Sequence, residues 1–468
     1  MLTTEQAAVV SHLQSTASIG YTLVDSVAGS GKTHLLVAIS KAIPHTNGLY
    51  ICYNSSIAAE AKHKFPATTS CSTTHSLAYR AVVKQYRLKL GNFYYKSILE
   101  KVPYDKKQRI VDYIKSFCLS SYTSFDAYVA SCPTESLIAT LSRKYLDLMQ
   151  AGKIECGHEF YLKLFHLLLA NGTLTYDPFD FIMLDEAGDL NEVTLAIFQL
   201  LPSPRKIAVG DQHQNIYQFN ETINCFNVLN GQGTLFHLTK SFRVSPDIAS
   251  RVERFCQRYL DPTMKFSGTT QPGEPETFAY LTRTNSALIA HMITCINAKK
   301  QFGLVRNPDE IFKMALMVCY FKYQSFITVP AYSHLQADVD EYYENIDLYK
   351  PQSLLQYLSE LHNHDEPLLQ AIKLVQRYGA QNIMNAYSVA KTCSKSPQNY
   401  ILATGHSCKG LEFDEVHIAD DLNASIRKVT SAPHFNPSAI SDTDREALNI
   451  YYVACTRARL RLINATEL

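Results

Sequence analysis

Three carboxylates stand close together in the phrase IMLDEAGD, residues 182–189. Asp185 and Glu186 end an apolar run, and Asp189 follows after two small residues. Neighbouring carboxylates can bind a divalent cation and can accept a proton from an attacking water. The phrase alone does not separate this chemistry from the polar rim of a buried strand. A phosphate-binding loop upstream in the same chain would decide in favour of chemistry.

Such a loop lies in YTLVDSVAGSGKTHLLVAIS, residues 21–40. We expect a short buried strand over 21–25, a tight loop over 26–31 and an apolar-periodic helix from Lys32. Lys32 can reach the β- and γ-phosphates of a nucleotide, and the Thr33 hydroxyl can ligate Mg²⁺. Loops of this kind usually begin with Gly or Ala, where this chain has Ser26. The backbone N–H groups that would face the phosphates belong to Ala28, Gly29, Ser30 and Gly31.

The loop gives the two acids a role. Carboxyl ends of parallel strands gather at one edge of a sheet, where ligands bind. There Asp185 would hold Mg²⁺, and Glu186 would orient and deprotonate the attacking water. The alternative interpretation of the loop at 26–31 is a glycine-rich turn before an ordinary helix. Since strand, loop, Lys-Thr and helix occur in the required order, the sequence predicts an NTP-hydrolysing site.

Six short motifs narrow the class. In chain order they are AGSGKT, LDEAGD, VGDQHQNIY, SFR, GHSCKGLEF and YVACTRA. Together they resemble the UvrD/Rep-type helicases of superfamily 1. Two further segments, LYICYNSSIAAEAKHKFP at 49–66 and TTHSLAYR at 73–80, resemble the F-box helicase branch, although no F-box segment is present.

The resemblance implies an α/β fold of two RecA-like P-loop NTPase domains, each a parallel sheet flanked by helices with a mainly helical insertion. It implies ATP and Mg²⁺ as cofactors. Gln6 would read the adenine edge, its alternative being a helix-surface Gln, and Glu412 would contact the ribose. Gln214 would sense the γ-phosphate, and two arginines would neutralise charge on the transferring phosphoryl group. The arginines are Arg243, expected at a helix start, and Arg457, expected within a helix; His34 stands where the family often has a stacking Arg, and its role stays open.

The same resemblance implies a partner, single-stranded or partly duplex DNA, with translocation from 3′ to 5′. Aromatic side chains would stack on bases, with core packing as the alternative for each. Other polar side chains would bind backbone phosphates. The stacking candidates are Tyr53, Tyr217 and Phe219; the phosphate candidates are Asn54, Thr73, His75 and His406.

Two departures from the family stand out. Gly188 replaces the Gln of its DExQD phrase, which predicts looser coupling between hydrolysis and DNA. FNET at 219–222 replaces FRGA, which puts a DNA-contacting loop in doubt.

The motifs also divide the chain. The first RecA-like domain would comprise 1–84 and 156–240, with a helical insertion at 85–155. The second would comprise 241–290 and 396–468, with a helical insertion at 291–395. Protein partners could bind through the insertions. From Arg80 to Lys115 basic residues outnumber acidic ones, with tyrosines interleaved; this segment would either flank the DNA path or form a solvated basic helix.

Composition sets the remaining bounds. With 46% apolar and 19% charged residues and a net charge of +1, the chain reads as a soluble globular protein without a global field for nucleic acid. No signal peptide and no apolar run near ~18 residues is recognised, which predicts an intracellular protein. The 12 cysteines include no CxxC pair, so free thiols are expected.

Three functions remain. The first is an ATP-dependent DNA helicase. The second is a translocase that evicts proteins from single-stranded DNA, and the third is an ATP-binding accessory subunit. Retention of Lys32, Glu186 and both arginines argues against the third.

Overall fold

The computed structural model divides into two compact units, 1–241 and 242–468, and each is described by itself. Among the described residues no helix is long and apolar enough to cross a lipid bilayer. The residues described are 1–15, 19–216, 222–271, 273–322, 339, 341–343, 353–393, 398–432 and 435–468.

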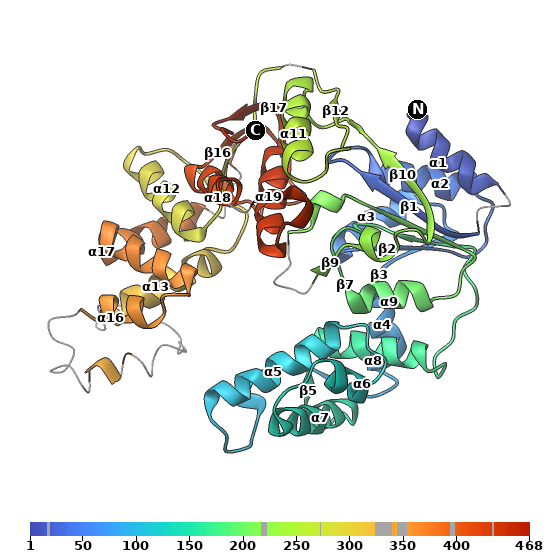
Figure 1. Ribbon diagram of the computed structural model, residues 1–468, viewed down its shortest axis with the longest axis horizontal. Helices are drawn as coiled ribbons and strands as arrows, with labels where there is room; N and C mark the ends of the chain where they lie inside the picture. Colours follow the sequence, from blue (N-terminus) through green and yellow to red (C-terminus); the bar gives the residue numbers. More distant parts are fainter. Residues whose placement is uncertain are drawn as a thin grey trace. The chain divides into compact units, whose positions relative to one another are not determined.

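The first unit is built on a six-stranded sheet in which every neighbouring pair is parallel (Figure 1). Its strands therefore end at one edge, where their carboxyl ends carry the loops that follow. In spatial order the strands are β10 (Gly233–Leu238), β1 (Gly20–Ser26), β8 (Arg205–Gly210), β6 (Phe181–Leu184), β2 (Gly48–Cys52) and β3 (Thr69–Thr73).

Helices cover both faces of this sheet because successive strand side chains point to opposite sides. On β2, Tyr50 and Cys52 join the core beneath one set of helices, and Leu49 and Ile51 join the core beneath the other. The first set is α1 (Thr4–Gln14), α2 (Lys32–Ala42) and α3 (Ser55–Lys64), and the second is α4 (Thr74–Ala78), α8 (His158–Ala170) and α9 (Glu192–Leu200).

The segment between α4 and α8 is mainly helical and shares one continuous apolar core with the sheet face that it extends. Figure 1 shows α5, α6 and α7 packed beyond α8 and α9. The larger elements here are α5 (Tyr104–Leu119), α6 (Phe125–Ser131), α7 (Ser136–Gln150) and the parallel pair β4 (Lys89–Leu90) and β5 (Glu155–Cys156). The shorter elements of the unit are a π-helical turn (Tyr79–Val83), 3₁₀ turns (Tyr95–Ser97 and Gln212–Gln214), β7 (Leu190–Asn191), β9 (Thr222–Ile223), α10 (Cys225–Val228) and β11 (Lys240–Ser241).

The second unit contains a five-stranded parallel sheet. In spatial order its strands are β14 (Gly303–Leu304), β15 (Tyr400–Thr404), β13 (Phe278–Thr282), β16 (Phe413–Ile418) and β17 (Ala458–Ile463). The other elements are α11 (Pro246–Tyr259), β12 (Ser267–Gly268), α12 (Asn285–Asn297), α13 (Pro308–Lys322), α16 (Leu354–Leu361), α17 (Glu366–Cys393), α18 (Asp420–Thr430), a 3₁₀ turn (Pro437–Ala439) and α19 (Asp442–Cys455).

The α/β fold of parallel sheets flanked by helices is confirmed, as expected of two RecA-like domains. Three local details differ from the sequence expectations. Strand β10 was not anticipated, Arg243 precedes α11 by three residues, and Arg457 follows the end of α19. In addition, α12 continues across residue 290 and β14 pairs with β15, so the second sheet extends past the boundary drawn from the motifs.

Candidate nucleotide site and nucleic-acid interface

The phosphate loop connects the end of β1 to the start of α2. Gly29 and Gly31 have φ values of +76° and +80°, in the left-handed region that residues with a Cβ rarely adopt. Gly31 is the N-cap of α2, so the positive end of the helix dipole faces the loop. Ser26 donates its hydroxyl hydrogen to the carbonyl oxygen of Gly210 at 2.6 Å. The serine that departs from the usual loop pattern therefore joins β1 to the end of β8.

Lys32 and Glu186 meet at this edge. The Lys32 Nζ lies 3.2 Å from the Glu186 Oε2, although Glu186 follows β6 and Lys32 begins α2. Glu186 has a φ of +54°, which is unusual for a residue other than glycine. Backbone strain of this kind concentrates at functional sites, where the surrounding structure enforces it. The fold thus holds a general-base candidate against the phosphate-loop lysine.

Asp185 is buried beside this pair, with only 6% of its surface exposed. Its Oδ2 accepts a hydrogen bond from the Tyr50 hydroxyl at 2.7 Å, and its Oδ1 accepts one from the Glu186 N–H at 2.9 Å. Burial and the neighbouring Glu186 charge raise the pKa of Asp185 to about 6, against the opposing effect of Lys32. A buried carboxyl next to a second acid is well suited to receive a cation, because the cation relieves both desolvation and repulsion.

The positive charge of Lys32 is stabilised by the acids around it. Burial by itself would lower the pKa of Lys32, but the carboxylates of Glu186, Asp211 and Asp185 together raise it above its usual value. Lys32 therefore stays protonated and can bind phosphate oxygens. Asp211, at the end of β8, also accepts a hydrogen bond from the Gln214 side chain at 2.7 Å. Gln214, the predicted γ-phosphate sensor, is thereby linked to the acids around Lys32.

The predicted adenine-side residues lie beside the loop. Gln6 is 1% exposed, so it is not on the helix surface. Its amide donates to the Ser30 carbonyl at 3.1 Å, while its Oε1 accepts from the Thr3 N–H in a capping box. Thr33 is half-buried in the first turn of α2, and His34 beside it is exposed.

Gly188 occupies a position with no room for a side chain. A Cβ placed there would lie 2.3 Å from the Asp211 carbonyl oxygen, and the backbones of Gly188 and Gly210 also approach closely. The turns after β6 and β8 are packed against each other through these glycines. The family glutamine would require a different backbone at this point, which gives the departure at Gly188 a steric cause.

In the second unit, the structure brings two predicted residues together. The Arg243 guanidinium lies 2.8 Å from the Glu412 carboxylate. Arg457 is 1% exposed and donates from Nε to the Val453 carbonyl at 2.9 Å and from Nη2 to the Thr456 hydroxyl at 3.1 Å. Within their unit, both arginines are held by specific polar contacts.

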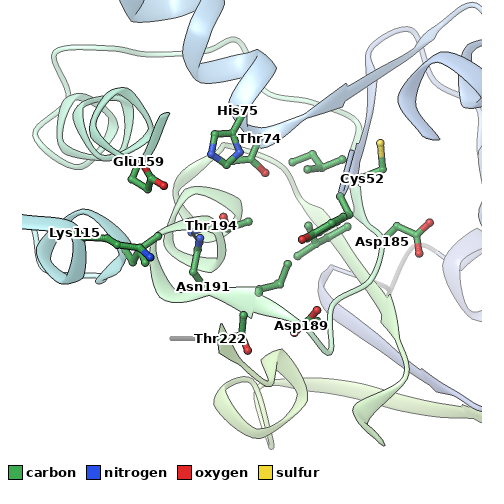
Figure 2. Close-up of a pocket in the computed structure, with 15 residues that line it drawn as sticks. Cys52, Thr74, His75, Lys115, Glu159, Asp185, Asp189, Asn191, Thr194 and Thr222 are labelled. Carbon is green, nitrogen blue, oxygen red and sulfur yellow. Dashed lines mark hydrogen bonds between the residues drawn. The ribbon is translucent and has the colours of Figure 1, made fainter. Parts of the chain in front are cut away.

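A cavity of about 410 Å³ lies in the first unit between the sheet edge and the helical insertion. It includes two predicted DNA-binding residues, Tyr53 and His75, and also Asp189 from the opening phrase. Tyr53 is 62% exposed, which does not fit core packing. Burial lowers the pKa of His75, so its imidazole is neutral near pH 7. Figure 2 shows His75 and Lys115 on walls that face the strand ends carrying Cys52 and Asp185.

The remaining predicted DNA contacts have local roles of their own. Asn54 caps α3 by accepting from the Ile57 N–H at 2.9 Å, and Thr73 caps α4 in the same manner. His406 lies 3.9 Å from Glu446. The stacking candidates Tyr217 and Phe219 lie outside the described residues.

Comparison with known proteins decides the family. The sequence profile described as the UvrD-like helicase C-terminal domain matches residues 73–466. The chain belongs to the UvrD-like helicases. It is 25% identical to the F-box DNA helicase protein 1 of Schizosaccharomyces pombe, over 94% of this chain and 55% of that protein. It is 24% identical to the F-box DNA helicase 1 of Gallus gallus, over 100% of this chain and 49% of that protein.

These relatives place this UvrD-like helicase near the F-box helicase branch, as its motifs suggested. The chain spans about half the length of the curated relatives it matches.

Sequence reasoning missed Tyr50 and gave Asp211 no role in this UvrD-like helicase. Tyr50 holds Asp185 only because β2 lies beside β6 in a register that pairs Tyr50 with Met183. That register leaves no mark in the sequence. Asp211 did carry a signal, since it is an acid at the end of a buried strand, as Asp185 is.

Proposed function

We propose that this chain is an ATP-dependent DNA helicase that translocates 3′ to 5′ on single-stranded DNA and couples ATP hydrolysis to strand separation. One observation carries the proposal: Lys32, Glu186 and Asp185 converge beside a glycine-rich phosphate loop at the carboxyl edge of a parallel sheet. That convergence is the arrangement that NTP hydrolysis requires. The names of the relatives, both DNA helicases, support DNA as the substrate.

The donor groups fit ATP with Mg²⁺. Mg²⁺ is usually held by one or two carboxylates or hydroxyls together with substrate phosphates, and Asp185 and Thr33 supply such oxygens. When bound, the cation neutralises charge on the phosphates. Lys32 exchanges its ion pair with Glu186 for phosphate oxygens, which frees the Glu186 carboxylate to take a proton from the attacking water. The loop backbone at 28–31 cradles the phosphates.

Other residues have supporting roles in this proposal. Gln6, already fixed against the phosphate loop, reads the adenine. Gln214 reports the γ-phosphate through its bond to Asp211. Arg243 and Arg457 supply positive charge to the transferring phosphoryl group. The Glu412 carboxylate gives up its ion pair with Arg243 and contacts the ribose instead.

DNA binding is assigned to the cavity between the strand ends and the helical insertion. The exposed ring of Tyr53 stacks on a base, and His75 binds the backbone as a neutral donor. Asn54, Thr73 and His406 bind further backbone phosphates. The rings of Tyr217 and Phe219 stack on further bases.

The test is the ATPase rate with and without a single-stranded oligonucleotide. We expect a large stimulation by DNA, and unwinding of a duplex with a 3′ overhang but not of one with a 5′ overhang. Absence of stimulation would favour the ATP-binding accessory subunit. Stimulation without unwinding, combined with displacement of a strand-bound protein, would favour the evicting translocase.

A further inference from the structure

Lys115 is a residue of the helical insertion that lines the cavity of the first unit. It lies on α5 and lines the cavity opposite Cys52 and Tyr53. Figure 2 shows its side chain directed toward the cavity that Asn191 and Thr194 also line. Lys115 is exposed and makes no ion pair with any of the described residues. A lone cation at the rim of a cavity is available to a ligand that brings its own negative charge.

One face of α5 leads away from this cavity. Tyr104 and Lys115 are eleven residues apart, which places them about 20° apart around the helix and roughly 16 Å apart along it. The buried side of α5 is a different one, with Ile110, Ile114 and Phe117 in the core. The stripe between Tyr104 and Lys115 is therefore a side face of α5, beside the core rather than in it.

A tyrosine cluster lies at the far end of the stripe. The ring centroids of Tyr94 and Tyr95 are 5.9 Å apart, and those of Tyr95 and Tyr104 are 4.8 Å apart. Tyr94 and Tyr104 are each 47% exposed. The Lys96 ammonium lies 5.9 Å from the Tyr95 ring centroid. Exposed aromatic rings with an adjacent cation are the combination that binds single-stranded nucleic acid without reading its sequence.

The other basic side chains of α5 already have partners. Lys106 and Arg109 both pair with Glu135, and Lys107 donates to the Ile98 carbonyl at 2.7 Å. Among the basic residues of α5, all of which the structure describes, Lys115 therefore remains available to a ligand. Inside the cavity, Glu159 and Asp189 add negative charge, so a cation at the rim offsets part of the repulsion that a strand backbone meets there.

We propose that Lys115, Tyr104, Tyr94 and Tyr95 form an α5 track that binds a continuation of the DNA strand beyond the cavity. This inference rests on the proposed function, since it takes single-stranded DNA as the ligand. Lys115 binds the backbone phosphate at the cavity rim, and the tyrosine cluster stacks on bases further along. The roughly 16 Å between them spans about five nucleotides at ~3.4 Å each, or fewer if the strand is extended. The helical insertion is then part of the DNA-binding site.

The test measures affinity for labelled oligo(dT) of increasing length by fluorescence anisotropy. The variant Tyr94→Ala/Tyr104→Ala should bind long oligonucleotides about 10-fold or more weakly per lost stacking ring. It should bind the shortest oligonucleotides, which fill only the cavity, as the unchanged protein does. Lys115→Ala should reduce the slope of log affinity against log salt by about 0.7, and Lys115→Glu should weaken binding further.

Matched controls lie on the same insertion. Lys153→Ala removes another exposed lysine, and Leu137→Ala removes an exposed apolar side chain from α7. Both should match the unchanged protein, and thermal unfolding should show that every variant folds. If the unchanged protein binds DNA and the track variants bind all lengths equally well, the α5 track is wrong while the proposed function stands. If the unchanged protein binds no single-stranded DNA, the proposed function fails first.

Discussion

The two units hold their nucleotide-site candidates differently. In the first unit, Lys32 and Glu186 form a half-buried ion pair at the sheet edge, beside the buried Asp185. In the second unit, Arg243 is paired with the half-exposed Glu412, and Arg457 is buried among backbone carbonyls. The candidate residues of the first unit lie close to one another. In the second unit, the two arginines make their ion pairs and hydrogen bonds with other residues of the same unit.

This difference separates two kinds of assignment. For the first unit, geometry and motif bring the same residues to one place, where we propose that a phosphate binds. For the second unit, the motifs predict a role in catalysis, and the contacts of the buried Arg457 give that residue a role in stability as well. Variants that change activity without changing stability, or stability without changing activity, therefore test whether the two units differ in this way.

The largest effect is expected at Arg243. Arg243→Ala removes a cation proposed to stabilise charge on the transferring phosphoryl group, so ATP turnover should fall by about 10³-fold or more. Stability should change little, because the lost ion pair with Glu412 is partly exposed. Steady-state phosphate release and thermal unfolding check both parts. Turnover near the normal level would mean that Arg243 does not act in catalysis and only pairs with Glu412.

Arg457→Ala should instead unfold the second unit more easily. The guanidinium is buried and donates to the Val453 carbonyl and the Thr456 hydroxyl, and hydrogen bonds from charged groups contribute about 1.5–3 kcal/mol each. We expect the free energy of unfolding to fall by several kcal/mol, measured by urea denaturation. An unchanged free energy of unfolding together with lost turnover would show that catalysis, not folding, requires Arg457.

Gly188→Ala tests how tightly the first site is packed. Its Cβ would meet the Asp211 carbonyl oxygen at 2.3 Å, so we expect a loss of about 1–3 kcal/mol in unfolding free energy. The matched control is Gly273→Ala in the second unit, where the nearest atom, of Leu460, is 3.6 Å away. Denaturant midpoints compare the two variants. Equal midpoints would mean that the turns after β6 and β8 can separate freely.

The effect that is smallest near neutral pH is a pH dependence in each unit, because it develops only as the pH falls. Burial, aided by Lys163, lowers the pKa of His166 in the first unit to about 4, and burial, aided by Lys300 and His417, lowers that of His291 in the second to about 4. Since an unfolded histidine titrates near 6.5, the unfolded state binds more protons between pH 6.5 and 4. Each histidine therefore costs up to about 1.4 kcal/mol of stability per pH unit as pH falls through that window.

His166→Leu and His291→Leu should each remove this slope from one unit only. Denaturation at a series of pH values, with probes in each unit, measures the slopes. A slope that persists in both variants would show that these imidazoles become protonated without unfolding.

The sequence predicted which candidate residues lie close together better in the first unit than in the second, for a physical reason. Glu186 closely follows the buried strand β6, and Lys32 follows the buried strand β1 across the phosphate loop. Parallel strands bring their carboxyl ends together whatever the order of the strands. The α/β class followed from the resemblance of the motifs to the family. The partners of Asp185 and Arg243 could not be predicted, because Tyr50 and Glu412 reach them through strand register and loop packing. The clash at Gly188 likewise depends on how closely two turns approach.

ATP turnover by Glu186→Gln, at saturating ATP, Mg²⁺ and single-stranded DNA, tests the site most directly. The amide keeps the shape of the side chain but cannot accept the proton from water, so turnover should fall by about 10²–10⁴-fold while ATP still binds. Turnover at the normal rate would mean that Glu186 is not the base. The convergence of Lys32, Asp185 and Glu186 would then not be the hydrolytic site.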